Sequence, residues 1–305
     1  MGVKPYEVFF DHFFRDTEPG DFPLRFAVET TNYCNLRCPM CPRELSERGY
    51  GLIDVDLMKS CADQAAGREV IFYTQGFGEV FLHPRFHEIL RHLRSTGIRY
   101  SCVITNGTQL DDENIGALID AEVAILIVSL DGAEKAAFER ARKNAVYEDV
   151  VARTKRVFEI RKARGAERPH IVLSVVGSDE VRPSLDLFRA EWAPYLGEHD
   201  EIFVCSVVSW AGTMTIADSS CRPKPVAGRT RKPCRMLYKT LTVYYDGRAT
   251  PCCYDHACKL EVGNAKTQTI EAIWKGEPLA RLRRLHEEGR VDEIDLCRGC
   301  PDYIE

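Results

Sequence analysis

The sequence lacks any run of apolar residues close to the roughly eighteen needed to cross a bilayer, and its N-terminus lacks a signal peptide. Internal repeats and low-complexity tracts are also missing. The net charge of −5 and the pI near 6.0 give no sign of a surface for nucleic acid or anionic membranes. We therefore expect a cytoplasmic protein with neither a membrane nor a nucleic acid as its partner.

Cysteine, by contrast, is abundant, with 13 residues in a chain of 305. Without a secretion signal, so many cysteines argue for a reducing compartment and against a disulfide framework. With 45% hydrophobic residues the chain can bury a sizeable core, and its length allows one large domain and a small one. We therefore look for metal or cluster chemistry in the cysteine positions.

Strand-like and helix-like segments alternate from residue 24 onward, a rhythm that implies a parallel sheet. We expect strands at 25–29, 69–74, 99–105, 123–130, 170–176 and 201–208, and helices at 55–67, 85–95, 111–121, 147–164 and 184–195. Six such units favour an α/β fold, a partial (β/α)6 TIM-like barrel, with its site at the carboxyl ends of the strands. The predicted parts are an N-terminal extension (1–22), the barrel (23–212), a basic, proline-rich linker (213–233) and a small domain (234–305) with a hairpin at 240–250 and a helix at 272–288 capped by Thr269.

Three cysteines, Cys34, Cys38 and Cys41, follow the first predicted strand within eight residues. A loop this short can turn three thiolates towards one point, and soft thiolates select zinc or iron–sulfur clusters. Zinc sites take four protein ligands, and no fourth Cys or His lies near this loop. Three thiolates fit a [4Fe–4S] cluster that leaves one iron open for another ligand.

This CxxxCxxC loop after a strand resembles the signature of the radical S-adenosylmethionine (SAM) enzymes. The resemblance implies that the open iron takes the amino and carboxylate groups of SAM, and that reduction of the cluster cleaves SAM to a 5′-deoxyadenosyl radical. Residues 74–84 are similar to the family's Gly-Gly-Glu-Pro stretch, with Val80 in place of the proline. Glycines allow close backbone approach and a carboxylate pairs with an ammonium group.

By the same resemblance, further SAM contacts follow the third and fourth strands. Ser129 and Asp131 alternate on one face of a strand, although a strand ending in an Asp-Gly turn has the same pattern. Arg142 is either a partner of the SAM carboxylate or a solvated arginine. Residues 210–212 are further adenine contacts. The SAM residues implied are Met40, Gly76, Gly78, Glu79, Asn106, Ser129, Asp131 and Arg142.

A second cysteine set, Cys234, Cys252, Cys297 and Cys300, has intervals of 17, 44 and 2 residues. Its spacing alone fits either zinc or a second [4Fe–4S] cluster. Behind a radical SAM barrel, the segment resembles the auxiliary-cluster domains called SPASM or twitch. Too few cysteines remain for two further clusters, so the resemblance implies one auxiliary cluster with four protein ligands, with Cys258 as the rival ligand.

The reaction is open between two chemistries of aminoglycoside-pathway members, represented by neomycin C epimerase and 2-deoxy-scyllo-inosamine dehydrogenase. In epimerisation, a thiol returns a hydrogen atom to the opposite face of the carbon radical. Cys253 follows the predicted ligand Cys252, and backbone alternation can aim it at the barrel mouth, so we favour epimerisation with Cys253 as donor. In dehydrogenation of a secondary alcohol, the auxiliary cluster accepts an electron instead.

The expected substrate is a small polyhydroxylated molecule, an aminoglycoside or related sugar, because the chain is acidic and only about twenty residues precede the first strand. Peptide modification is an alternative, but such maturases often carry an N-terminal recognition domain. A two-cluster electron-transfer protein is another, although it would not need the SAM-binding motifs. The resemblance implies a flavodoxin- or ferredoxin-type reductant, two [4Fe–4S] clusters and SAM.

Overall fold

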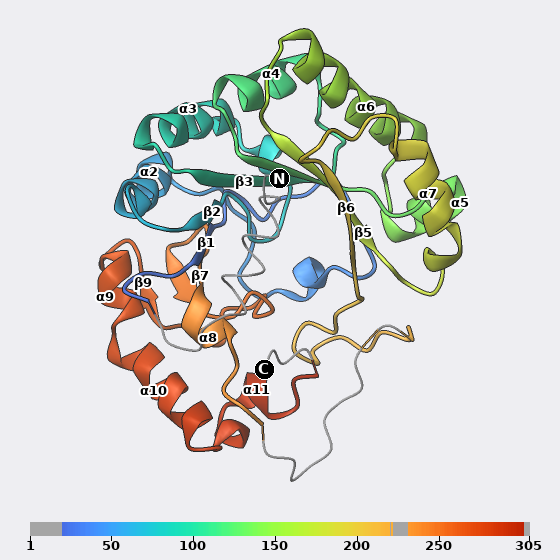
Figure 1. Cartoon of the computed structure of the whole chain (residues 1–305). Helices are drawn as coiled ribbons and strands as arrows, with labels where there is room; N and C mark the ends of the chain where they lie inside the picture. Colours follow the sequence, from blue (N-terminus) through green and yellow to red (C-terminus); the bar gives the residue numbers. More distant parts are fainter. Residues whose placement is uncertain (1–19, 220, 222–230, 302–305) are drawn as a thin grey trace.

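The computed structural model describes residues 20–219, 221 and 231–301, and its centre is one sheet of nine strands (Figure 1). Six of them run parallel in the order β6-β5-β4-β3-β2-β1. Their bounds are β1 (Arg25–Val28), β2 (Ile71–Tyr73), β3 (Tyr100–Thr105), β4 (Ile125–Ser129), β5 (His170–Val176) and β6 (Glu201–Cys205). The fold is thus the partial α/β barrel that the sequence predicts, and β6 is one of its open edges.

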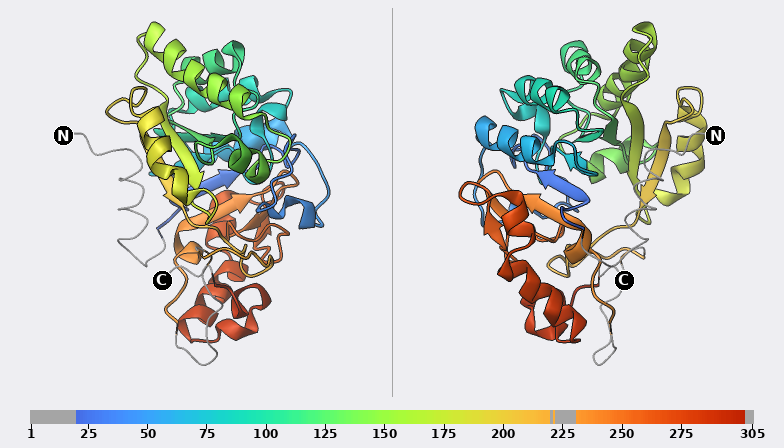
Figure 2. Two further views of the ribbon diagram at one scale, coloured as in Figure 1. Left: turned by 90° about the vertical axis from the view of Figure 1, so that its right-hand side faces the viewer. Right: turned by 60° about the vertical axis from the view of Figure 1, so that its left-hand side comes forward.

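The helices between these strands cover the outer face of the curved sheet (Figures 1 and 2). They are α2 (Val55–Ala65), α3 (Phe86–Thr96), α4 (Asp112–Asp120), α5 (Lys135–Ala141), α6 (Tyr147–Ala163) and α7 (Leu185–Trp192). Single 3₁₀ turns lie at Pro42–Leu45, Val80–Leu82, Arg182–Ser184 and Val291–Glu293. Helix α5 is absent from the sequence-based prediction because seven residues show too little periodicity. No helix among the described residues combines the length and apolarity that a membrane crossing requires.

Successive side chains of a strand point to opposite faces of the sheet, so the apolar side chains form two separate groups. Side chains such as Phe26, Phe72 and Leu173 face outward and pack with the helices. Residues between them on the strands, together with Ala124 just before β4 and Met236 from the C-terminal part, form a second cluster that we call the interior group. Its members are Ala27, Ile71, Tyr73, Cys102, Ala124, Ile125, Ile127, Val172 and Met236.

The sheet continues from the barrel into the C-terminal part of the chain. Strand β7 (Thr240–Val243) pairs in parallel with β1, matching Arg25 to Thr240 and Val28 to Val243. Strands β8 (Arg248–Thr250) and β9 (Gly263–Asn264) then add to it in antiparallel fashion. The predicted hairpin is therefore also the extension of the barrel sheet.

The C-terminal helices lie beyond this extension, below the barrel in Figure 1. Thr269 caps α9 (Ile270–Trp274) as expected, its hydroxyl accepting from Ala272 N at 3.1 Å. The single helix predicted for 272–288 is wrong in one respect, because Gly276 and Pro278 end α9 and start α10 (Glu277–Glu287). Short helices α8 (Met236–Lys239) and α11 (Asp295–Arg298) flank these two. Most of the predicted extension and part of the predicted linker fall outside the described residues.

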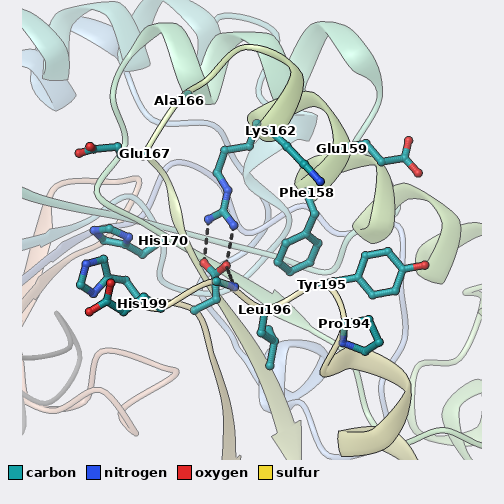
Figure 3. A pocket seen from close by; sticks show the side chains of 14 residues that line it. Phe158, Glu159, Lys162, Ala166, Glu167, His170, Pro194, Tyr195, Leu196 and His199 are labelled. Carbon is teal, nitrogen blue, oxygen red and sulfur yellow. Dashed lines mark hydrogen bonds and ion pairs between the residues drawn. The ribbon is translucent and has the colours of Figure 1, made fainter.

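A groove at the amino-terminal ends of β5 and β6 is lined by a largely buried ion pair between Arg161 and Asp200 (Figure 3). Asp200 accepts from Arg161 at 2.7 and 2.5 Å, and from the backbone N–H of Ile171 and Gly197, both at 2.8 Å. Burial opposes ionisation of Asp200, but these hydrogen bonds outweigh it and lower the pKa of its carboxyl group. None of the residues predicted for the site lines this groove, so we assign Asp200 a structural role.

Replacing Asp200 with asparagine should lower the free energy of unfolding by about 3 kcal/mol, because Arg161 is then left with little solvent and no counter-charge. A carboxyl group with a lowered folded pKa loses its contribution only as pH falls below the unfolded value of about 4. The difference between variant and wild type should therefore stay constant from pH 8 to pH 5 in urea unfolding. Asp186→Asn, at an exposed ion pair, should change stability by under about 0.5 kcal/mol. A pH-dependent difference in that range would contradict the assignment.

Candidate radical SAM site

A cavity of about 250 Å³ lies at the carboxyl ends of the parallel strands. The cysteine loop, the segments after β2 and β3 and the ends of β4 and β5 contribute its lining. Of the residues predicted for the first cluster and for SAM, the lining contains Cys34, Cys38, Cys41, Met40, Gly76, Gly78, Glu79, Asn106, Ser129 and Arg142. The structure thus brings together motifs that are up to about a hundred residues apart in sequence.

Hydrogen-bond donors from the cysteine loop itself and from neighbouring segments reach the thiols of this cavity. Asn106 Nδ2 lies 3.7 Å from Cys34 Sγ, and Arg142 Nη1 lies 3.9 Å from Cys38 Sγ. The backbone N–H of Leu36 donates to Cys34 Sγ at 3.4 Å. Donors aimed at cysteine sulfur stabilise thiolate ligands and tune the reduction potential of a bound cluster.

The electrostatics of the thiols fit a cationic centre. Burial raises the pKa of Cys34, and burial together with the neighbouring Cys38 and Cys34 raises the pKa of Cys41 to about 11. Thiolates crowded in this way need a metal centre to offset their mutual repulsion. Within the described residues, no three His, Cys, Asp or Glu side chains are placed to hold a single metal ion. The fit to an iron–sulfur cluster rests instead on the shared cavity and on this crowding.

The glycines of the segment after β2 are required by close packing on the cysteine loop. Gly78 has φ +106°, and a Cβ there would lie 2.7 Å from the Tyr33 carbonyl oxygen. A Cβ on Gly76 would lie 2.8 Å from Glu29 Oε1. The backbone of this segment therefore sits directly against the loop and faces the cavity.

Glu79 is the carboxylate of this segment, and it is almost fully buried. Burial raises the pKa of Glu79 to about 7, against the hydrogen bonds from Asn106 N and Thr105 Oγ1, both at 2.7 Å. Phe81 N approaches the same carboxylate at 3.5 Å. An ammonium group in the cavity would favour the charged form, which agrees with the predicted role towards the SAM amino group.

Asp131 departs from the predicted arrangement, because it is fully buried and does not line the cavity. Its Oδ2 accepts from Arg142 Nε at 2.7 Å and its Oδ1 from Val176 N at 2.7 Å. Asp131 therefore orients Arg142 and does not face a ligand itself. Ser129, two residues earlier, does line the cavity, next to Ser174 on β5.

Trp210 enters the cavity from the segment after β6 and is held in a strained backbone. Its φ is +53° and that of Ala211 is +59°, a region that costs roughly 1–3 kcal/mol per non-glycine residue. Its indole N–H donates to the Met40 carbonyl at 2.7 Å, and its ring packs on Phe77 with centroids 5.5 Å apart. The strain is thus maintained by contacts with both the cysteine loop and the glycine segment.

A buried ion pair, missed from the sequence, ties three parts of the site together. Glu29, the residue after β1, accepts hydrogen bonds from Arg48 at 2.7 and 3.0 Å, and both side chains are almost inaccessible. The other donors to Glu29 are Phe77 N at 2.9 Å and Tyr245 N at 3.2 Å. Arg48 Nε donates to the His256 carbonyl at 2.8 Å. No local sequence signal links these positions, because the partners lie up to 216 residues apart.

The second cysteine set also shows mutual crowding. Burial, followed by the nearby Cys253, Cys234, Asp255 and Cys297, raises the pKa of Cys252 well above its ordinary value. Burial and the neighbouring Cys234 and Cys300 raise the pKa of Cys297. These couplings link the four predicted ligands and fit an auxiliary cluster.

Cys258, the rival ligand, lies elsewhere. It packs with Phe77 and Tyr244, near Cys41 and Trp210. We therefore propose Cys234, Cys252, Cys297 and Cys300 as the auxiliary ligands. Cys253 packs with Tyr254 and Cys234 against the interior group of the barrel.

Comparison with known proteins agrees with this geometry. Residues 28–180, half of the chain, match the radical SAM superfamily, and residues 234–301 match SPASM, an iron–sulfur cluster-binding domain. The chain therefore belongs to the radical SAM superfamily and carries a SPASM-type domain. Radical SAM proteins of this kind use SAM and a [4Fe–4S] cluster, and the SPASM-type domain implies a further iron–sulfur cluster.

Individual relatives differ in what they act on. A tungsten-containing aldehyde ferredoxin oxidoreductase cofactor-modifying protein of Pyrococcus furiosus is 30% identical over 155 residues, which are 50% of this chain but only 43% of that protein. The PqqA peptide cyclase of Methylocella silvestris is 26% identical over 92% of this chain and 80% of its own length. The structure of BtrN with AdoMet and 2-DOIA is 16% identical, with a TM-score of 0.60 over 91% of this chain and 92% of that one. At 16% sequence identity, the similarity to the BtrN structure shows a shared fold.

Proposed function

We propose that the protein epimerises a carbon of a small polyhydroxylated substrate of the aminoglycoside or related sugar class, with Cys253 as the hydrogen-atom donor. One observation carries this proposal. The interior group that Cys253 contacts includes Ile127 and Val172, and the next residues on the same strand faces are Ser129 and Ser174 of the SAM cavity. Two residues along a strand span about 7 Å, so the interior group extends to the edge of the SAM cavity, and Cys253 packs against that group.

The proposed roles follow from this layout. Cys34, Cys38 and Cys41 would hold the first cluster, while Glu79, the glycine segment and Arg142 would orient SAM. When bound, the reduced cluster and SAM supply a one-electron cleavage that removes a hydrogen atom from a substrate carbon. Cys253 then gives its thiol hydrogen to the opposite face of that carbon. One electron and one proton restore the thiol before the next turnover.

Two other reactions have support of their own. Dehydrogenation of a secondary alcohol would use the four-thiol auxiliary cluster as electron acceptor, and the likeness of fold to the structure of BtrN with AdoMet and 2-DOIA supports a small-molecule substrate. Peptide modification is supported by the peptide cyclases that align over most of this chain. All three share the first cluster and SAM, and they differ in the fate of the substrate radical.

The test begins with mass spectrometry of products from a panel of aminoglycosides and precursor peptides. Epimerisation leaves the mass unchanged in ordinary water and adds one deuterium in deuterated water, whereas dehydrogenation removes two hydrogens. Cys253→Ala should abolish the epimer while 5′-deoxyadenosine still forms. Cys102→Ala, at a fully buried thiol of the same interior group, should retain epimerisation. Continued turnover of Cys253→Ala without solvent deuterium in the product would rule out the thiol donor.

A further inference from the structure

Trp210 stands at the border between the SAM cavity and the segment that carries Cys253. It is one of two aromatic residues that line the cavity in the described part of the chain, and the other, Phe77, is only 7% exposed. The Trp210 ring also meets the ring of Tyr254, with centroids 6.0 Å apart and planes at 83°. Tyr254 directly follows Cys253, and both pack against the interior group. Trp210 therefore joins the cavity to the segment of the proposed thiol donor.

The turn that carries Trp210 is fixed by hydrogen bonds of its own and by a contact with the C-terminal part. The backbone N–H of Gly212 donates to Ser209 Oγ at 2.9 Å, and the hydroxyl of Thr213 donates to the Trp210 carbonyl at 2.8 Å. Thr213 Oγ1 also lies 3.2 Å from His256 Nε2. The Trp210 side chain is nevertheless only partly buried. The turn thus holds a ring in a fixed position while part of that ring stays open to a ligand.

The carboxylates of the cavity already have partners or a role. Among the described residues that line it, Glu44 and Glu79 are the only acidic ones. Glu44 is paired with Arg43 at 2.5 Å, and Glu79 is the residue proposed for the SAM amino group. A protonated amino group on a substrate therefore finds no spare carboxylate in this lining. The face of a tryptophan ring attracts such a cation by about 0.5–2 kcal/mol, and Trp210 offers that ring.

We infer that Trp210 is a specificity-determining residue, which contacts an amino-substituted sugar or cyclitol and takes one protonated amino group over its ring. The inference deepens the proposed function and rests on it. In that function the substrate lies within reach of both the SAM radical and the Cys253 thiol, and Trp210 borders both places. The adenine of SAM has no need to approach Cys253. The position of Trp210 therefore favours a substrate contact over the adenine contact expected for residues 210–212.

The test uses the reconstituted enzyme with SAM, and 2-deoxystreptamine and its N,N′-diacetyl derivative as charged and neutral probes. Trp210→Leu removes the ring, whereas Trp210→Phe keeps an aromatic face and loses the N–H bond to the Met40 carbonyl. Tyr195→Leu, which removes a partly buried ring from the groove of Figure 3, is the matched control.

Calorimetry should show that the charged probe binds roughly tenfold more weakly to Trp210→Leu, about threefold more weakly to Trp210→Phe, and unchanged to Tyr195→Leu. The neutral probe should bind wild type and Trp210→Leu equally weakly. For any aminoglycoside that is converted, the KM of the substrate should rise at least fivefold more than the KM of SAM in Trp210→Leu.

Other outcomes overturn the inference or separate it from the function on which it rests. If Trp210→Leu raises the KM of SAM as much as that of the substrate, Trp210 is an adenine contact. Equal losses in Trp210→Phe and Trp210→Leu would assign Trp210 to holding the Met40 carbonyl, and a charged probe that binds no better than the neutral one would exclude the cation site. If the charged probe depends on Trp210 but no aminoglycoside is epimerised, the proposed function fails while this inference stands.

Discussion

Glu29→Gln is expected to lower the free energy of unfolding by about 3–5 kcal/mol, because it leaves the buried Arg48 without its counter-charge. The carboxylate of Glu29 accepts four hydrogen bonds, two from Arg48 and one each from Phe77 N and Tyr245 N. An amide nitrogen at either oxygen position would face donors with a donor. The contact of Arg48 with the Tyr244 ring at 3.8 Å offsets only part of this loss.

Guanidinium unfolding at matched cofactor content measures this effect. Glu277→Gln, which breaks an exposed ion pair with Arg284, should cost under about 1 kcal/mol. Combining Glu29→Gln with Arg48→Met should recover part of the stability, because the unpaired charge is then gone. If Glu29→Gln lowered the free energy of unfolding by less than about 1 kcal/mol, the Glu29–Arg48 ion pair would not be what holds the three segments together.

Replacing Cys38 with alanine should remove one complete cluster, about four iron atoms per chain, and abolish formation of 5′-deoxyadenosine. Cys252→Ala should remove the other cluster and leave the first in place. Cys258→Ala and Cys61→Ala should keep both clusters, since Cys258 packs beside Tyr244 and Cys61 lies on the buried face of α2. Iron analysis with electron paramagnetic resonance distinguishes these four variants.

The expected effect of Cys61→Ala is confined to a modest loss of stability from the missing buried side chain. If Cys258→Ala instead loses a cluster while Cys252→Ala retains it, the proposed ligand set is wrong. If Cys61→Ala loses iron, the assay reports folding and not ligation.

Much of the barrel follows from local pattern. Strand β5 has its predicted bounds, and β1 to β4 differ at their ends by a few residues, because apolar runs bounded by turns mark them clearly. The helix predicted for 272–288 fails at Gly276 and Pro278, a local signal that was present in the sequence. The parallel pairing of β7 with β1 has no such signal, since it depends on closing a loop of about two hundred residues.

The residues of the site also fall into those that local sequence predicts and those that only the tertiary contacts reveal. Spacing places the cysteines, glycines and Glu79 in one cavity because parallel strands end at a common edge. Asp131 has the right position on the strand, but Arg142 and Val176 N occupy its oxygens, and this depends on tertiary contacts. Glu29 and Arg48 carry no motif at all, so only the folded chain reveals that they join the cysteine loop to the C-terminal part.

The continuous sheet has a consequence for how the chain divides. Removing residues 234–305 would strip β7 from β1 and expose the backbone N–H and C=O groups of Arg25–Val28, the strand that leads into the cysteine loop. A truncated barrel would therefore present an open, apolar edge and tend to aggregate. We expect the barrel and residues 234–305 to unfold in a single transition. The reason is that residues 234–305 supply β7, the strand that pairs with β1 beside the first cysteine loop.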